Sequence, residues 1–325
     1  MLTFIEAIES LEEGETPSIL LANGFSQAWD SGIFNYANLL DAANFDSRDA
    51  VLRALFANLD TYDFETVMQQ LVAAEAVITA YGTNPSLITQ IRNDQVILKE
   101  ALITAISNTH PELPGNVTDA QYIAVRQFLS QFKEIFTLNY DLLLYWARNK
   151  NDFPPVHWRT DDGFRAHRRW KGYETDQEVY FLHGGLHIYD TKTDIKKHAY
   201  TEDGETIIEQ VRENLENGRF PLFVSEPSHE KKKTKIEHNP YLSFCYRALI
   251  NMNGVLFIYG HSIDENDKHI FDQIKLSRIS KVFVSIYGDE NNAANTRTKA
   301  NALAFMQTPT TSVEFYQAES TPVWA

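Results

Sequence analysis

Polar residues that can bind or transform a small molecule stand directly after four apolar runs of this 325-residue chain. An amide such as Asn139 can donate and accept hydrogen bonds, and an imidazole such as His183 exchanges protons near neutral pH. Glycines beside them let the backbone approach a ligand closely. The four clusters are Asn23-Gly24-Phe25-Ser26, Asn139-Tyr140-Asp141, His183-Gly184-Gly185, and Gly260-His261-Ser262 with Asp264.

Each of these residues also has a purely structural explanation. His183 could bond to backbone at the end of a strand, and Asn139 could close a turn through its own backbone. Asp141 could serve as a first-turn carboxylate that stabilises the helix after it. From its position alone, the structural explanation of His183 is the better one.

The outer two clusters have structural alternatives of the same kind. Gly24 and Ser26 are typical of a strand-to-helix turn whose serine caps the helix. Asp264 and Asp267 could cap the helix that follows them, and for Asp267 we favour capping.

Continuous apolar runs separated by helical stretches predict the elements that position these residues. Such runs are typical of parallel strands that are covered on both faces, so we expect a Rossmann-like, doubly wound and mostly parallel α/β sheet. The expected strands are 19–22, 135–138, 179–183, 220–225, 255–260, 281–288 and 312–317.

Between residues 46 and 132 the chain shows apolar residues three and four apart and no convincing strand. We therefore expect a helical insertion over 31–132 in a core formed by 1–30 plus 133–325. Two polar stretches, roughly 149–178 and 190–204, are expected to form surface loops.

Ligands of an open parallel sheet bind outside the carboxyl ends of its strands, where helix N-termini favour phosphate. A fold that needed only stability would not have to place Asn, Asp, His and Ser at four strand ends. The pattern therefore predicts one site for a phosphorylated, ribose-containing ligand.

Composition narrows the classes of function. The net charge of −15 disfavours a general nucleic-acid binder, and the single cysteine, Cys245, excludes an internal disulfide and a multi-cysteine metal site. The acidic start lacks the basic region of a signal peptide, and no apolar run is long enough to span a bilayer, so we expect a cytoplasmic protein.

Two basic stretches and the histidines have simple interpretations. "HEKKKTK" (229–235) could steer a phosphorylated ligand or contact a partner, but we favour a solvated segment. "DGFRAHRRW" (162–170) could form a lid, a partner surface or a nucleic-acid contact, the last disfavoured by charge. The histidines show no convincing ligand spacing, so no metal is expected.

The four clusters together resemble sirtuin-like domains. "LLANGFS" resembles the Gly-Ala-Gly-x-Ser turn of sirtuins, "TLNYDLL" their Thr-Gln-Asn-x-Asp-x-Leu segment, and "LHGG" their Leu-His-Gly segment. "VLFIYGHSIDENDKHIF" is similar to their Gly-x-Ser strand end, and all four occur in the expected order. The resemblance covers about 17–30 and 135–290 and is closest to bacterial sirtuin-like effectors of anti-phage defence that hydrolyse NAD+.

This resemblance implies an NAD+ glycohydrolase that releases nicotinamide and ADP-ribose. It implies His183 as base, with Asn139 and Asp141 beside it at the catalytic site. NAD+ would be bound, as substrate, by the other strand-end residues, with Gly260 and Ser262 on the adenosine side. These residues are Asn23, Gly24, Phe25, Ser26, Gly184, Gly260, Ser262 and Asp264.

The resemblance also implies regulation in abortive infection. A constitutive NADase would harm its host, so we expect a silent effector that forms an oligomer or hetero-complex and responds to an activating partner or signal. Two departures matter: Ala22 and Asn23 replace the first Gly and the Ala of the sirtuin turn, and the four-cysteine zinc module is missing.

Other functions stay open at this point. The chain could transfer an ADP-ribosyl or acyl group, although the missing zinc module disfavours acyl transfer. It could also be a non-catalytic sensor of NAD or ADP-ribose within a complex. A purely structural role would make the four clusters fortuitous.

Overall fold

The computed structural model describes residues 1–32, 39–82, 84–200, 206–226 and 228–325. Its centre is a six-stranded sheet in the order β3-β2-β1-β7-β8-β9, and every neighbouring pair of strands runs parallel. The expected Rossmann-like α/β fold is confirmed. The strands are β1 Ser18–Leu21, β2 Ile135–Thr137, β3 Val179–Phe181, β7 Asn253–Tyr259, β8 Arg278–Ile286 and β9 Ser312–Gln317.

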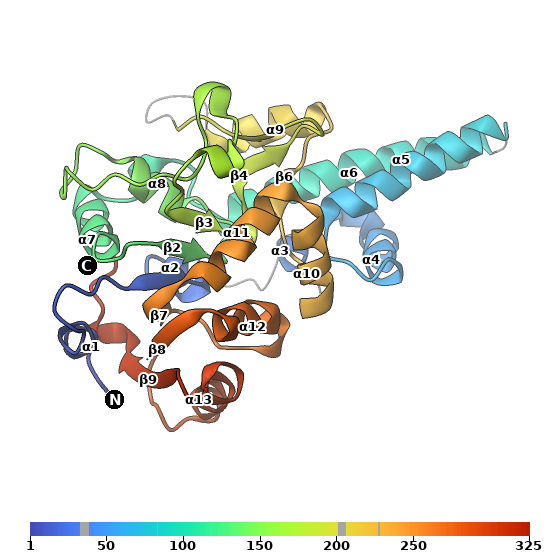
Figure 1. Cartoon of the computed structure of the whole chain (residues 1–325). Helices are drawn as coiled ribbons and strands as arrows, with labels where there is room; N and C mark the ends of the chain where they lie inside the picture. The colour runs from blue at the N-terminus through green and yellow to red at the C-terminus, as the bar shows by residue number, and fades with distance from the viewer. Residues whose placement is uncertain (33–38, 83, 201–205, 227) are drawn as a thin grey trace.

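Five strands of this sheet, the edge strand β3 among them, are buried over most or all of their length. All residues of β1, β2 and β3 are buried, as are the last five residues of β7 and of β8. Helices follow the strands and cover the sheet (Figure 1). They are α1 Phe4–Glu9, α2 Asn23–Gln27, α8 Leu143–Asn149, α10 His229–His238, α11 Pro240–Asn251, α12 Lys268–Leu276 and α13 Ala293–Met306.

The described residues from 39 to 129 form helices joined by turns and short loops, with no strand among them. These helices are α3 Leu39–Ala42, α4 Asp49–Asn58, α5 Phe64–Ala80, α6 Pro85–Thr109 and α7 Asp119–Leu129. Helices α5 and α6 form a long hairpin that projects from the body (Figure 1), and Asp63 and Asn84 cap their N-termini. Residues 33–38 and 83 of the predicted insertion lie outside the described residues. No helix in the described part of the chain is both long and apolar enough to cross a membrane.

A second, three-stranded antiparallel sheet in the order β5-β4-β6 was not expected. The run 220–225, predicted as a strand of the parallel sheet, is β6 Pro221–Phe223 and pairs with β4 Gly184–Asp190. β5 Ile195–Lys197 lies inside a predicted loop, and the next helix is α9 Ile207–Glu216. The sequence pattern did not predict this sheet, because β4 begins with two glycines and β5 is short and mostly polar.

The junction between the two sheets is tight. Gly184 follows β3 at a φ of +73°, and a Cβ there would overlap the carbonyl oxygen of Leu222. Only glycine adopts this backbone without strain, so Gly184 allows the chain to cross from one sheet to the other. His183, immediately before it, is thereby fixed at the carboxyl end of β3, where its carbonyl accepts from the amide of Val224.

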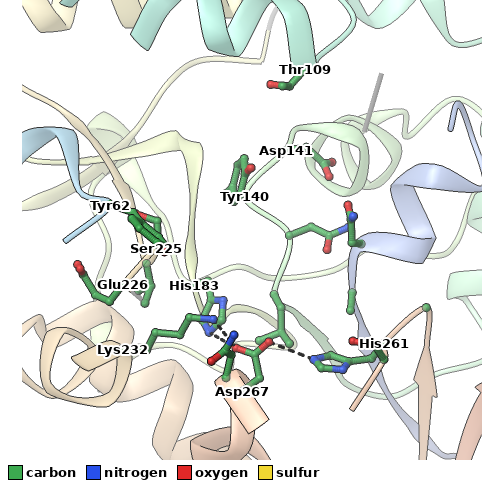
Figure 2. Close-up of a pocket in the computed structure, with 18 of the residues that line it drawn as sticks. Tyr62, Thr109, Tyr140, Asp141, His183, Ser225, Glu226, Lys232, His261 and Asp267 are labelled. Atoms are coloured by element: carbon green, nitrogen blue, oxygen red, sulfur yellow. Dashed lines mark hydrogen bonds and ion pairs between the residues drawn. The ribbon is translucent and has the colours of Figure 1, made fainter. Parts of the chain in front are cut away.

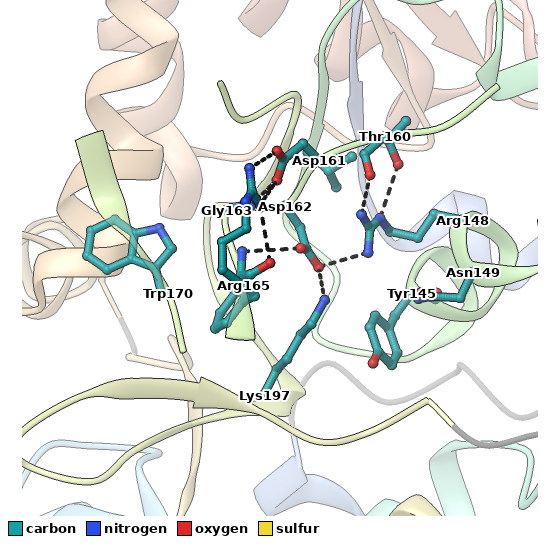
Figure 3. Close-up of polar contacts among 12 residues, drawn as sticks. Tyr145, Arg148, Asn149, Thr160, Asp161, Asp162, Gly163, Arg165, Trp170 and Lys197 are labelled. Carbon is teal, nitrogen blue, oxygen red and sulfur yellow. Dashed lines mark hydrogen bonds and ion pairs between the residues drawn. The ribbon is translucent and has the colours of Figure 1, made fainter. Parts of the chain in front are cut away.

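The predicted surface loop around 162–170 is anchored by a buried ion cluster (Figure 3). Oδ2 of Asp162 lies 2.8 Å from Nη1 of Arg148 in α8 and 2.6 Å from Nζ of Lys197 in β5. Burial raises the pKa of Asp162, but the two cations outweigh this effect and hold the pKa below its usual range. The loop start is therefore a structural clamp between α8 and the small sheet.

Candidate functional site

Strands β1, β2 and β7 end around a cavity of about 490 Å³. β1 lies between β2 and β7, so the chain winds to one side of β1 first and to the other side later. Open parallel sheets bind ligands at such a reversal. Six predicted site residues from all four clusters line the cavity: Asn23, Asn139, Asp141, His183, Gly260 and Ser262.

The ends of β1 and β2 are joined by a buried relay of hydrogen bonds. Nδ2 of Asn139 donates to Oγ of Ser26 at 2.8 Å, and this hydroxyl donates to Oδ2 of Asp141. Oδ1 of Asp141 accepts from the backbone N–H of Leu143 at 2.9 Å. The relay leaves the side-chain oxygen of Asn139 without a donor among the described residues, although this side chain reaches the cavity wall.

Burial raises the pKa of Asp141 to about 6, although Ser26, Leu143 and Asn139 donate to its carboxylate and oppose the shift. A carboxyl group with this pKa changes charge within the physiological range of acidity. Perturbed groups of this kind are common in functional sites, where burial tunes them. The relay therefore places a titrating acid beside a fixed amide.

The turns after β1 and β7 touch each other through two glycines. The amide of Gly24 donates to the carbonyl of Gly260 at 2.9 Å, and a Cβ on Gly260 would lie 2.5 Å from Cα of Gly24. Gly260 has a φ of +73°, which also favours glycine. Each glycine is therefore needed because the other lies so close to it. Their contact holds the two strand ends at a fixed distance.

The loop after β7 is fixed by hydrogen bonds on both sides. Ile263 has a φ of +50°, a strained value for a β-branched residue. Its carbonyl accepts from Nδ2 of Asn301, and its amide donates to Nδ1 of His261 at 2.7 Å. Because Nδ1 is an acceptor, the neutral ring of His261 carries its proton on Nε2 and points that N–H at Asp267.

Asp267 is the centre of a polar cluster at the cavity (Figure 2). Its Oδ1 lies 2.8 Å from Nζ of Lys232 and 3.9 Å from Nε2 of His183, and its Oδ2 lies 3.3 Å from Nε2 of His261. Burial raises the pKa of Asp267, but His261, His183 and Lys232 together hold the pKa well below its usual range. Asp267 is therefore a stable anion.

His183 is a neutral imidazole in this setting. Burial lowers its pKa to about 3, and the nearby Asp267 carboxylate only partly offsets the effect. Its ring stacks against His269 with centroids 5.7 Å apart and an angle of 11° between the planes. Any proton that His183 takes up would form an imidazolium beside Asp267, which would stabilise it.

His110, at the end of α6, fixes the loop that carries Asn139 and Asp141. Its Nε2 accepts from the amide of Leu142 at 2.7 Å, and its Nδ1 bonds to the carbonyl of Pro111 at 2.7 Å. This pattern requires a neutral ring, and burial lowers its pKa to about 4. The helical region thus holds the loop after β2 in place through His110, which also lines the cavity.

The remaining predicted residues lie around the cavity and do not line it. Phe25 is in the core against Trp324, whose Nε1 donates to its carbonyl. Ser26 is fully buried beneath the site, and Gly184 is in β4. Asp264 caps the short helix at Glu265–Asp267, as its structural explanation proposed.

Sequence reasoning missed the central position of Asp267 and the contribution of Lys232. Asp267 does not cap α12 with its side chain, contrary to the interpretation favoured above, because the carboxylate faces the cavity cluster. The signal available in the sequence was that Asp267 lies six residues after His261. Lys232 lies in the predicted solvated segment, but its side chain is only 14% exposed, since α10 brings it to the cavity.

A second cavity, of about 630 Å³, lies beside the first. The two share the backbone turn Gly260-His261-Ser262, and the second also includes Gly24. Tyr287 after β8 and Trp324 near the chain end line it. The cluster around Asp267 and these aromatic rings therefore belong to neighbouring cavities that share one turn as a wall.

The fold and site define an α/β protein with a polar cavity at the winding reversal of a parallel sheet. Residues 19–324 match a family model described as a domain of unknown function, DUF4917. The match covers most of the chain, which therefore belongs to this family. No curated protein matches the chain.

Proposed function

We propose that the chain binds NAD+ in the two adjoining cavities and hydrolyses it to nicotinamide and ADP-ribose. The observation that carries the proposal is the junction of Asn139, Asp141 and His183 around one cavity at the winding reversal. Side chains from β1, β2, β3 and β7 meet there, as the strand-end pattern and the resemblance to sirtuin-like domains imply.

The charge of the first cavity suits the reacting end of NAD+. Its described lining includes the carboxylates of Asp41, Asp141, Glu226 and Asp267, with Lys232 as the one Lys or Arg side chain. The nicotinamide ring of NAD+ is cationic, and cleavage develops positive charge on the ribose, as in glycoside hydrolysis. Buried anions stabilise such charge more strongly than water does.

The proposed step has a simple balance of bonds and protons. The bond between the ribose C1′ and the nicotinamide nitrogen breaks, and its electron pair leaves with neutral nicotinamide, so no general acid is needed. The oxygen of water bonds to C1′, and its proton passes to His183, whose imidazolium would be stabilised by Asp267. The free oxygen of Asn139 would orient the water or a ribose hydroxyl.

The second cavity gives the rest of the dinucleotide a place. The diphosphate would cross the shared turn Gly260-His261-Ser262, and the adenosine would lie between the rings of Tyr287 and Trp324. Aromatic faces of this kind stack on bases. This arrangement keeps Gly260 and Ser262 on the adenosine side.

The biological setting of the proposal rests on the sequence resemblance. We propose a cytoplasmic effector of anti-phage defence that stays silent until a partner or signal activates it, as an oligomer or hetero-complex. A second candidate is a sensor that binds NAD or ADP-ribose without turnover. It is favoured by the low pKa of His183, about 3, because such a ring is a weak base.

Chromatographic separation of nicotinamide and ADP-ribose after incubation with NAD+ tests the proposal. The wild type is expected to release both in equal amounts. Asn139→Ala and His183→Ala should each lower the rate by about 10²-fold or more, the range for a positioned catalytic group. The exposed side chains of Asn93 and His157 supply matched controls, and Asn93→Ala and His157→Ala should keep full activity.

Equal activity of the two site variants and the wild type would contradict the assigned roles. Binding of NAD+ without release of nicotinamide, also after co-expression with the neighbouring genes, would favour the sensor.

A further inference from the structure

We propose that His183, Asp267 and His269 form a binding site for a first-row divalent transition metal such as zinc. The cleavage of NAD+ proposed above does not require a metal ion. The metal site is argued from the positions of these three side chains, without reference to the nucleotide. His269 is the additional residue, on the first turn of α12, two positions after Asp267.

The three side chains bring their ligand atoms close to the spacing that a metal centre needs. One ligand atom from each lies within 4.8 Å of the others, and Nε2 of His183 lies 3.9 Å from Oδ1 of Asp267. Ligand atoms around a tetrahedral zinc are about 3.3 Å apart, given bonds of about 2.0–2.1 Å. The ligand atoms would have to draw closer together, and the nearly parallel rings of His183 and His269 would have to rotate so that one nitrogen of each faces the ion.

Both imidazoles are buried, and three of their ring nitrogens lack a hydrogen-bond partner among the described residues. Nε2 of His183 and both ring nitrogens of His269 have no hydrogen bond within the described part of the chain. His183 is 5% exposed and His269 is 2% exposed. A buried donor or acceptor that stays unpaired is costly, so such nitrogens call for an unseen partner. A metal ion would satisfy one nitrogen on each ring.

The carboxylate already has the support that a metal ligand needs. His261 bonds to Oδ2 of Asp267, and the amide of Ile263 fixes the tautomer of His261 in turn. Hydrogen bonds of this kind orient metal-ligating carboxylates. They leave Oδ1 directed toward His183 and Lys232.

Lys232 occupies the position that the ion would compete for. Its ammonium lies 2.8 Å from Oδ1 of Asp267 and neutralises the carboxylate. An incoming cation would have to displace this ammonium, whose flexible side chain can swing into the cavity that Lys232 lines. Lys232 would thus weaken metal binding, whereas the three ligands would strengthen it.

Two imidazoles and one carboxylate are the ligands of zinc hydrolase sites and of facial Fe(II) sites. Both metals keep open coordination positions for water or substrate. The cavity that His183 and Asp267 line would provide room for them. The ion and a proton would compete for Nε2 of His183, so metal binding at this nitrogen and its use as a base exclude each other.

Calorimetric titration of the metal-stripped full chain with ZnCl2 tests the site, with cobalt absorption as a second readout. The wild type should bind one zinc with defined stoichiometry and give the visible bands of cobalt held by nitrogen ligands. His269→Gln should weaken binding more than tenfold, and Lys232→Gln should tighten it. His157→Ala removes an exposed histidine and should change nothing.

Circular dichroism of each variant would establish that it folds. If His269→Gln loses its structure, His183→Gln takes its place in the same comparison. Zinc binding that is unchanged in the folded ligand variants, or no stoichiometric binding by wild type and Lys232→Gln, would overturn the proposal. These readouts involve no NAD+, so a failure of the metal site is distinguished from a failure of the proposed hydrolase activity.

Discussion

Single residues of this site owe their properties to burial and to one or two neighbours. Asp141 and Asp267 are both buried carboxylates, yet burial raises the pKa of Asp141 to about 6, whereas a lysine and two histidines hold the pKa of Asp267 well below its usual range. Two acids with opposite shifts within one cavity are a typical arrangement for dividing chemical roles. Asp141 is suited to a proton-linked role and Asp267 to a fixed negative charge.

The raised pKa of Asp141 predicts a pH dependence of stability. Its pKa of about 6 in the folded protein exceeds the ordinary aspartate value of 3.8, so the protonated group favours folding. This contribution is fully present below about pH 4 and is lost as the pH rises through about 6. In Asp141→Asn, the free energy of unfolding relative to wild type should therefore rise by up to about 3 kcal/mol between these limits.

Urea unfolding at several pH values measures this difference. Comparing variant with wild type cancels the contribution of buried histidines such as His110, whose lowered pKa has the opposite effect. Asp152→Asn, at an exposed carboxylate, is the matched control and should give a curve parallel to wild type. A parallel curve for Asp141→Asn would show that the carboxylate is not penalised by burial.

At the scale of elements, the site depends on how closely the strand ends approach. The turns after β1 and β7 meet at Gly24 and Gly260 without room for a side chain. This contact explains why the turn has Gly24, although Ala22 stands where the sirtuin turn has its first glycine. The glycine is required by the neighbouring strand, whether or not a diphosphate also passes there.

Gly24→Ala is therefore expected to destabilise the fold. Its methyl group would overlap Cα of Gly260, and the backbone of two strand ends would have to shift, which costs about 2 kcal/mol or more. Gly115→Ala is the control, because a Cβ there meets no atom within 4 Å, and it should stay within about 0.5 kcal/mol of wild type. Thermal or urea unfolding measures both, and equal stability of the two variants would refute the close contact.

The parallel sheet and the helices were predictable from the sequence, because their signals are local. β1, β2 and β7 are continuous apolar runs, and α5 and α6 show helical spacing with capping residues at their starts. β5 was not predictable, because a three-residue polar strand is defined by its partner β4. The function of Gly184 likewise depends on β6, which is about forty residues away in the chain.

At the scale of the whole molecule, the cavity was predictable only in part. Asn139, Asp141, His183 and Gly260 were placed together by one rule, since parallel strands end on the same side of a sheet. Lys232 and His110 come from helices whose packing no local pattern encodes. The α5–α6 hairpin carries His110 at its inner end, so it is connected to the site as well as projecting from the body.

Calorimetric titration with ADP-ribose tests the central claim most directly. The claim is that the two adjoining cavities hold a dinucleotide. Binding can be measured without the activating partner or signal that hydrolysis is proposed to need. The account predicts one site per chain with a Kd below about 1 mM, the usual upper range for natural substrates, and weaker binding to Asn139→Ala for NAD+. No heat of binding with either ADP-ribose or NAD+ at millimolar concentration, for a folded wild type, would contradict it.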